Sequence, residues 1–105
     1  MQLLCTSTQI PDDQSIGFSL DNKAIFAVRK QGKLYVYRNQ CPHLGINLEW
    51  LENQFLDTDG CLIQCAMHGA LFLIEDGQCI SGPCQGQKLT AIEYQELDGQ
   101  VFVQL

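Results

Sequence analysis

The chain has 105 residues, 46% of them hydrophobic and 17% charged, a balance typical of one globular domain that excludes intrinsic disorder. With only six Lys and Arg and a formal net charge of -6 at pH 7, nucleic acid is not an expected partner. No apolar stretch reaches the roughly 18 residues that span a bilayer, so no membrane partner is expected either.

The first residues give an expectation for the cellular location. Residues 1–5 carry no basic side chain, and Asp12 and Asp13 follow closely, so no secretory signal peptide is expected. We therefore expect a soluble cytoplasmic protein. In that compartment the six cysteines of the chain are more often metal ligands, reactive thiols or buried apolar residues than a disulfide framework.

Three stretches rich in β-branched and aromatic residues predict antiparallel strands in the first third of the chain. They are residues 15–20, 23–30 and 33–38. Gln31 and Gly32 predict a tight turn between the last two stretches. Residues of the third stretch alternate with a period of two, which is typical of a half-buried hairpin.

From residue 40 to about residue 86, Gly, Pro, Cys and His cluster and break the chain into short pieces. The expected pieces are strands at 61–64 and 71–74, turns at 57–60 and 75–77, and one helical turn within 48–55. A closing hairpin follows, with strands at 89–96 and 101–105 joined through 97–100. The pattern predicts an all-β chain with a site-bearing region in its middle.

The chain has two histidines, and each follows a cysteine closely along the chain. His43 comes two residues after Cys41, and His68 comes three residues after Cys65. Ligands at this spacing on a turn can point the same way and share a metal, because a turn reverses the chain within that distance. These four side chains are the candidate metal ligands.

The sequence Cys-x-His-x-Gly, followed by Cys-x-x-His-Gly, resembles the Rieske 2Fe-2S family. Gly45 and Gly69 end these two motifs, and residues 81–83, Ser-Gly-Pro, resemble the proline-bearing loop that covers the cluster in that family. The resemblance implies an antiparallel Rieske-like sandwich with a small inserted cluster-binding subdomain. Residues 1–105 would then form a single Rieske domain whose cluster-binding region spans about 40–86.

By the same resemblance, each chain would hold one 2Fe-2S cluster. Cys41 and Cys65 would bind the inner iron as thiolates, and His43 and His68 would bind the outer iron through imidazole nitrogens. Two neutral imidazoles leave the site less negative than four thiolates would, which accounts for Rieske potentials of roughly -150 to +300 mV.

Four further positions predict a potential toward the low end of that range. High-potential Rieske proteins join their two ligand loops by a disulfide, and the matching positions here are Ile46 and Met67, so the cluster region is expected to be free of disulfides. Those proteins also place a serine and a tyrosine hydroxyl near the cluster, where this chain has Ala70 and Phe72. Fewer donors to cluster sulfur stabilise the reduced state less.

Four cysteines remain outside the predicted ligand set. Cys5, Cys61 and Cys79 are interpreted as small buried apolar residues, and Cys84, beside the proline loop, as a candidate reactive thiol. The segment between His43 and Cys65 is longer than in most Rieske proteins, and the extra residues are expected to enlarge the excursion at 51–61.

The function expected first is that of a low-potential ferredoxin, an electron-transfer protein and not itself an enzyme. Its partners would be a reductase and an oxygenase or other terminal acceptor enzyme. A Rieske oxygenase subunit is excluded, because its mononuclear iron needs two further histidines. A small Rieske subunit of a reductase, such as nitrite reductase, remains an alternative.

Two other chemistries stay open at this point. The same four side chains could form a closed tetrahedral zinc site in a binding module, although common zinc patterns pair cysteine with cysteine first. Cys65 could instead be an enzyme nucleophile with a histidine as its base, a reading that leaves the second Cys-His pair unexplained.

Overall fold

The computed structural model describes residues 1–42, 48, 52–65 and 69–105, and these form three antiparallel sheets of three strands each. The terminal sheet has the order β1 (Gln2–Thr6), β9 (Gln100–Gln104), β8 (Glu93–Leu97); the central sheet contains β2 (Gln14–Leu20), β3 (Lys23–Lys30) and β4 (Lys33–Arg38); the small sheet contains β5 (Leu62–Gln64), β6 (Leu71–Leu73) and β7 (Cys79–Ser81). The prediction of an all-β antiparallel chain is confirmed.

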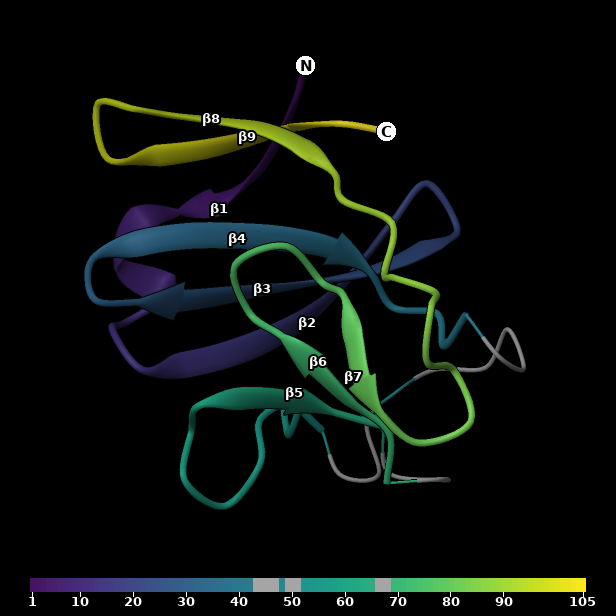
Figure 1. Cartoon of the computed structure of the whole chain (residues 1–105). Coiled ribbons are helices and arrows are strands. Elements are labelled where there is room, and N and C mark those ends of the chain that lie inside the picture. Colours follow the sequence, from purple (N-terminus) through teal and green to yellow (C-terminus); the bar gives the residue numbers. More distant parts are fainter. Residues whose placement is uncertain (43–47, 49–51, 66–68) are drawn as a thin grey trace.

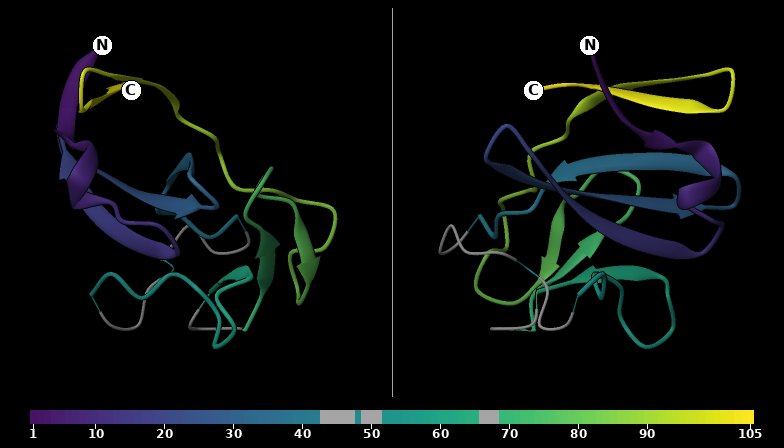
Figure 2. Two further views of the ribbon diagram at one scale, coloured as in Figure 1. Left: turned by 90° about the vertical axis from the view of Figure 1, so that its left-hand side faces the viewer. Right: turned by 180° about the vertical axis from the view of Figure 1, so that it is seen from behind.

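The central sheet lies between the other two (Figure 1). Both termini lie on the side of the terminal sheet, and the small sheet lies at the opposite end in every view (Figure 2). The small sheet is built from chain between β4 and β8, so it is an insertion into the strands of the other two sheets. A 3-10 turn, η1 (Ser7–Gln9), is the only helix in the described ranges, and it is far too short to cross a membrane.

Strand β3 explains how the three sheets hold together. Its alternate residues point to opposite faces, as in any strand. Ile25 and Ala27 are fully buried against residues of the terminal sheet, whereas Phe26 and Val28 are fully buried against residues of the small sheet. The central sheet is therefore covered on both faces, which explains why residues 24–28 in the middle of β3 are all apolar.

Most predicted strands match the structure closely. β3 and β4 have the predicted bounds, and the predicted turn at Gln31 and Gly32 joins them with positive φ angles of 52° and 80°. β1 and β7 were not predicted. The helical turn expected within 48–55 is not seen in its described residues, where Glu52 and Asn53 form a turn, and residues 49–51 lie outside the described part.

The strand predicted over 89–96 begins only at Glu93. The preceding residues instead cross from the small sheet to the terminal sheet along the edge of β4. Arg38 N donates to Thr90 O at 2.9 Å, and Ile92 N donates to Val36 O at 2.9 Å. This connection satisfies edge groups of β4 that would otherwise face water.

Candidate metal centre

Cys41 lies just beyond the end of β4 and is fully buried. The loop that contains it is closed at its neck by the side chain of Asn39, whose Oδ1 accepts a hydrogen bond of 2.8 Å from Leu48 N. Asn39 is itself only 6% exposed. The first predicted ligand is thus attached to the rigid central sheet at the point where the chain leaves it.

Cys65 follows β5 directly and is also fully buried. Two backbone hydrogen bonds of 2.8 Å close its turn, from Cys65 N to Ala70 O and from Gly69 N to Cys65 O. Gly69 has a φ of +64°, a left-handed conformation that glycine adopts without steric cost. The predicted ligands His43 and His68 lie outside the described residues.

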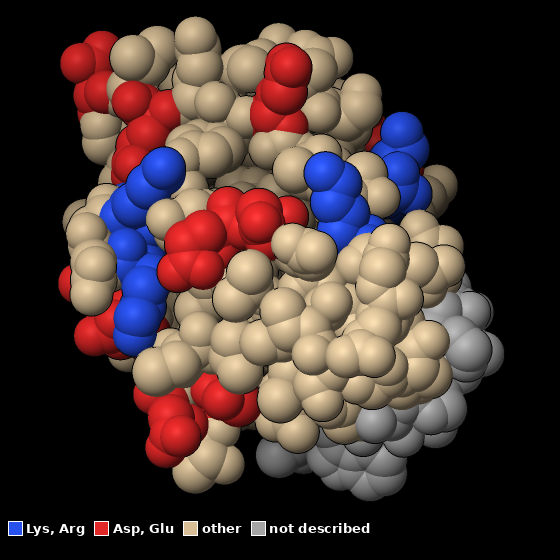
Figure 3. Space-filling view, in the orientation of Figure 1, with Lys and Arg blue, Asp and Glu red and all other residues tan. Residues whose placement is uncertain are grey.

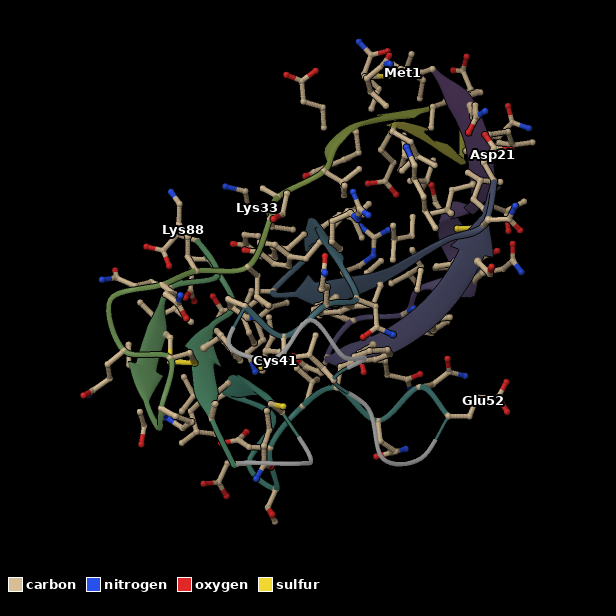
Figure 4. All side chains as sticks on the ribbon, turned by 90° about the vertical axis from the view of Figure 1, so that its right-hand side faces the viewer. Met1, Asp21, Lys33, Cys41, Glu52 and Lys88 are labelled. Atoms are coloured by element: carbon tan, nitrogen blue, oxygen red, sulfur yellow. A yellow bond between two sulfur atoms is a disulfide. The ribbon has the colours of Figure 1, made fainter. Side chains whose placement is uncertain are left out.

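The structure brings Cys41 and Cys65 into one buried group. Cys41 is labelled in Figure 4. That group is otherwise made of aliphatic, aromatic and cysteine side chains. Within the described ranges no three His, Cys, Asp or Glu side chains converge, so the two cysteines are the described part of the predicted ligand set. Buried sulfur in apolar surroundings fits a soft metal centre such as an iron-sulfur cluster.

The loop of residues 79–87, here called the cover loop, packs onto the turn that holds Cys65. A Cβ atom built on Gly82 would lie 2.9 Å from Ala70 Cα, and the φ of Gly82 is +102°. Only glycine fits this position without moving backbone. The predicted proline-bearing loop therefore contacts the second ligand turn directly.

The structure corrects the expectations for three of the other cysteines. Cys79 and Cys84 form a disulfide, with Cα atoms 5.9 Å apart. This separation is usual for disulfides. Cys84 is therefore not the reactive thiol expected, and Cys79 is not a free buried cysteine. The expectation of a disulfide-free cluster region is therefore wrong, although the cross-loop positions Ile46 and Met67 lie outside the described residues. Cys61 is exposed, not buried.

The spacing Cys-x-x-x-x-Cys around Gly-Pro was the sequence signal for this disulfide. A Gly-Pro turn reverses the chain, so cysteines on either side of it can approach each other. Cys5, by contrast, is buried as predicted, in the group between the central and terminal sheets.

Tyr37 fastens the small sheet to the central sheet. Its hydroxyl donates to Ile74 O at 2.6 Å, and its ring lies so close to Gly77 that a Cβ there would be 2.9 Å from Tyr37 Cε1. Burial raises the pKa of Tyr37, and the nearby carboxylate of Asp76 raises it further. The phenol therefore stays protonated and keeps its hydrogen bond over the whole physiological range.

The long segment before Cys65 packs along the edge strand β2. Ser15 Oγ donates to Asn53 O at 2.8 Å, and Gly17 N donates to Asn53 Oδ1 at 2.8 Å. Further along, Lys30 Nζ donates to Gly60 O at 3.1 Å. The described part of this excursion thus covers a strand edge at the side of the central sheet.

Comparison with known proteins gives one family. Residues 1–100 match the family described as "Rieske [2Fe-2S] domain". The chain is 28% identical over 81 residues to a cholesterol 7-desaturase of Caenorhabditis elegans and 37% identical over 78 residues to that of Xenopus laevis. The two matches include 76% and 70% of this chain, which spans only 18% and 16% of the length of the two desaturases.

A relative of similar length is the biphenyl dioxygenase ferredoxin subunit of Pseudomonas sp. (strain KKS102), 23% identical over 95 residues, with 90% of this chain and 84% of that protein covered. Among solved structures, the ferredoxin of carbazole 1,9a-dioxygenase from Nocardioides aromaticivorans IC177 has a TM-score of 0.76 at 19% identity, covering 98% of this chain and 94% of the other. A complex of fluorene-bound oxygenase and ferredoxin of carbazole 1,9a-dioxygenase has a TM-score of 0.82 at 25% identity. This match covers 96% of this chain and 27% of the other. The predicted sandwich with its inserted small sheet is confirmed.

Proposed function

The chain belongs to the Rieske [2Fe-2S] domain family, and on that premise we propose that it is a low-potential one-electron carrier of the ferredoxin type. When bound, the 2Fe-2S cluster of this family supplies the one-electron redox couple. The proposed partners are a reductase and an oxygenase or other acceptor enzyme. We also propose that residues 1–105 act as one Rieske domain, with a cluster-binding region of about 40–86, in the cytoplasm.

Four side chains are proposed as the ligands of that cluster. Cys41 and Cys65 would hold the inner iron through thiolate sulfur, and His43 and His68 would hold the outer iron through ring nitrogens. Complete burial of both cysteines supports this assignment, since a thiolate out of contact with water needs a cation beside it. The closed necks of the two loops support it as well, because they fix each cysteine backbone to a strand.

The observation that carries the proposal is the shared burial of Cys41 and Cys65 in a chain that matches this family over residues 1–100. The test is an EPR spectrum of the dithionite-reduced protein, with analysis of iron and acid-labile sulfide. A Rieske-type spectrum with equal amounts of iron and sulfide is expected. A colourless protein that contains zinc and no sulfide would overturn the proposal.

A second candidate is a Rieske subunit that stays bound to a larger oxidoreductase, such as a nitrite reductase. It is supported by the desaturases, in which the stretch that matches this chain is only 18% and 16% of the protein. Reductase-dependent reduction of cytochrome c separates the two functions. A free carrier turns over many times without stable association, whereas a subunit co-elutes with its enzyme in size-exclusion chromatography.

The side chains around the second ligand turn predict the redox potential. Ala70 and Phe72 are fully buried and have no hydroxyl. In Ala70→Ser or Phe72→Tyr, a new donor would favour the more negative reduced state by about 1 kcal/mol, or about 40 mV for one electron. Protein-film voltammetry should therefore give a higher potential for each variant. Phe102→Tyr, on β9 outside both buried groups, is the matched control and should leave the potential unchanged.

The strands of the small sheet carry no charged side chain, and the acidic residues of this region lie in the turns beside them, at 57–59 and 75–76. Residues 61–74 and 77–87 contain no Lys, Arg, Asp or Glu. In Figure 3 the surface over β6 and β7 is tan except at their acidic turn, while charged side chains gather elsewhere on that face. We propose that partners dock here through apolar and uncharged polar contacts, rather than through the acidic surface.

Ile80 tests this docking surface, because it is 41% exposed at the start of the cover loop. In Ile80→Asp, docking would have to remove water from the new carboxylate. Electron transfer from a ferredoxin reductase should therefore be about tenfold slower, which corresponds to roughly 1.4 kcal/mol of lost binding free energy. Leu97→Asp, at a residue 55% exposed on the terminal sheet, is the control. Stopped-flow rates that fall equally in both variants would contradict docking at the small sheet.

A further inference from the structure

The disulfide between Cys79 and Cys84 has no part in the function proposed above, yet it spans the loop that covers the second ligand turn. Cys79 and Cys84 are themselves only 3% and 0% exposed. The four residues between them, 80–83, are all exposed, and we call them the arc. The disulfide is thus buried, whereas the chain between its two cysteines is exposed.

The arc is in contact with the backbone that positions a proposed ligand. Gly82, inside the arc, approaches Ala70 so closely that an added Cβ would lie 2.9 Å from Ala70 Cα. Ala70 O in turn accepts the 2.8 Å hydrogen bond from Cys65 N. A displacement of the arc would therefore remove packing from the turn that carries Cys65.

Apart from the disulfide, the described contacts across the cover loop are hydrogen bonds. Gln87 contributes two backbone hydrogen bonds of 2.9 Å, one from Cys79 N to its carbonyl and one from its N-H to Cys84 O. Gln85 donates twice to the arc, from Nε2 to Ile80 O at 3.2 Å and from its backbone N to Gly82 O at 3.4 Å. At one end of the arc, Ser81 also pairs with Leu71 on β6. The hydrogen bonds within the loop lie near exposed residues, where water competes for them, and the disulfide is the covalent constraint on the arc.

The reduced form is also accommodated locally. Cys79 Sγ lies 3.3 Å from Ser81 O, a carbonyl that can accept the proton of a Cys79 thiol. Reduction would therefore not leave that thiol without a partner inside the protein.

We infer that the Cys79–Cys84 disulfide is a thiol-sensitive clasp that sets how firmly the arc covers the metal centre. The inference rests on the proposed function, since the covered site is the proposed cluster site. In the switching step a dithiol reductant breaks the sulfur-sulfur bond, transfers two electrons and two protons to form two thiols, and leaves as its own disulfide. The arc then opens more often, and the centre becomes more accessible.

The test uses the holoprotein with and without dithiothreitol under native, anaerobic conditions. Iodoacetamide labelling with mass spectrometry reports the state of Cys79 and Cys84. Iron release to ferrozine should become roughly tenfold faster on reduction, as expected when the open arc is about tenfold more populated. Trypsin cleavage after Lys88, the exposed residue that follows the cover loop, should accelerate likewise, whereas cleavage after Lys33, the exposed first residue of β4, should not (both labelled in Figure 4).

The double variant Cys79→Ser/Cys84→Ser is the matched control, because it should release iron at the fast rate whether or not dithiothreitol is added. The clasp is refuted if protein that labelling shows to be reduced at Cys79 and Cys84 still releases iron, and is still cleaved after Lys88, at the rates of the oxidised protein. It is also refuted if the native protein resists reduction or if freshly prepared protein lacks the disulfide. Cleavage after Lys88 reports the arc with or without a cluster. A missing Rieske EPR signal would therefore count against the proposed function alone.

Discussion

Replacing Cys65 by Ala is expected to give a folded protein that contains no cluster. Cys65 is fully buried at the end of β5, and the turn from Cys65 to Ala70 has its own backbone hydrogen bonds, which do not need the thiol. Removing one of the two proposed thiolates leaves the inner iron without half of its protein ligands. Iron analysis and EPR should show loss of the centre, while circular dichroism retains the β-sheet spectrum.

Two other cysteines serve as matched controls for this loss. Cys61→Ala removes an exposed thiol four positions earlier in the chain, and Cys5→Ala removes a buried thiol from the group between the central and terminal sheets. Both variants should keep the iron and the EPR spectrum of the unmodified protein. Retention of both in Cys65→Ala would contradict the ligand assignment, whatever the controls show.

The second large effect is expected at Phe55, which joins the long excursion to the central sheet. Its ring is fully buried and stacks on Phe26 with centroids 4.4 Å apart and planes 4° apart. Phe55→Ala removes this contact and leaves a cavity, which costs about 3 to 5 kcal/mol. Small domains are stable by only about 5 to 15 kcal/mol, so the variant should be partly unfolded near physiological temperature.

Urea unfolding followed by circular dichroism measures this change in the free energy of unfolding. Phe102→Ala is the control, because Phe102 is a partly exposed ring on β9 that belongs to neither buried group. Its cost should stay below about 1 kcal/mol, the range of a cross-strand pair on an open sheet face. Similar midpoints for both variants would mean that the stack on Phe26 contributes little.

Local patterns in the sequence predicted the local parts of the fold. β3 and β4 were predicted residue for residue because their apolar content and their two-residue turn lie within one short stretch. β1 was missed because it pairs with β9, from the other end of the chain, and its own five residues include only one buried side chain. Pairing over such a separation leaves no signal in the strand itself.

The candidate site was predictable in part for the same reason. The Cys-His spacing selected Cys41 and Cys65 as candidate ligands, which stays a prediction, and the structure places both in one buried group. The disulfide of Cys79 with Cys84 was missed despite the short spacing of the two cysteines, because a cytoplasmic location predicts reduced thiols. The role of Asn39 in closing the first loop was missed too, since its partner is a backbone N-H nine positions away.

The central sheet also determines how the protein should come apart. Two tyrosine hydroxyls link β4 to the outer sheets. Tyr37, on β4, donates to Ile74 O beside the small sheet, and Tyr94, on β8 of the terminal sheet, donates to Leu34 O on β4. Neither outer sheet has a second apolar layer of its own to keep it folded once the central sheet is lost. Unfolding should therefore be a single cooperative transition, with no stable fragment that keeps the metal centre.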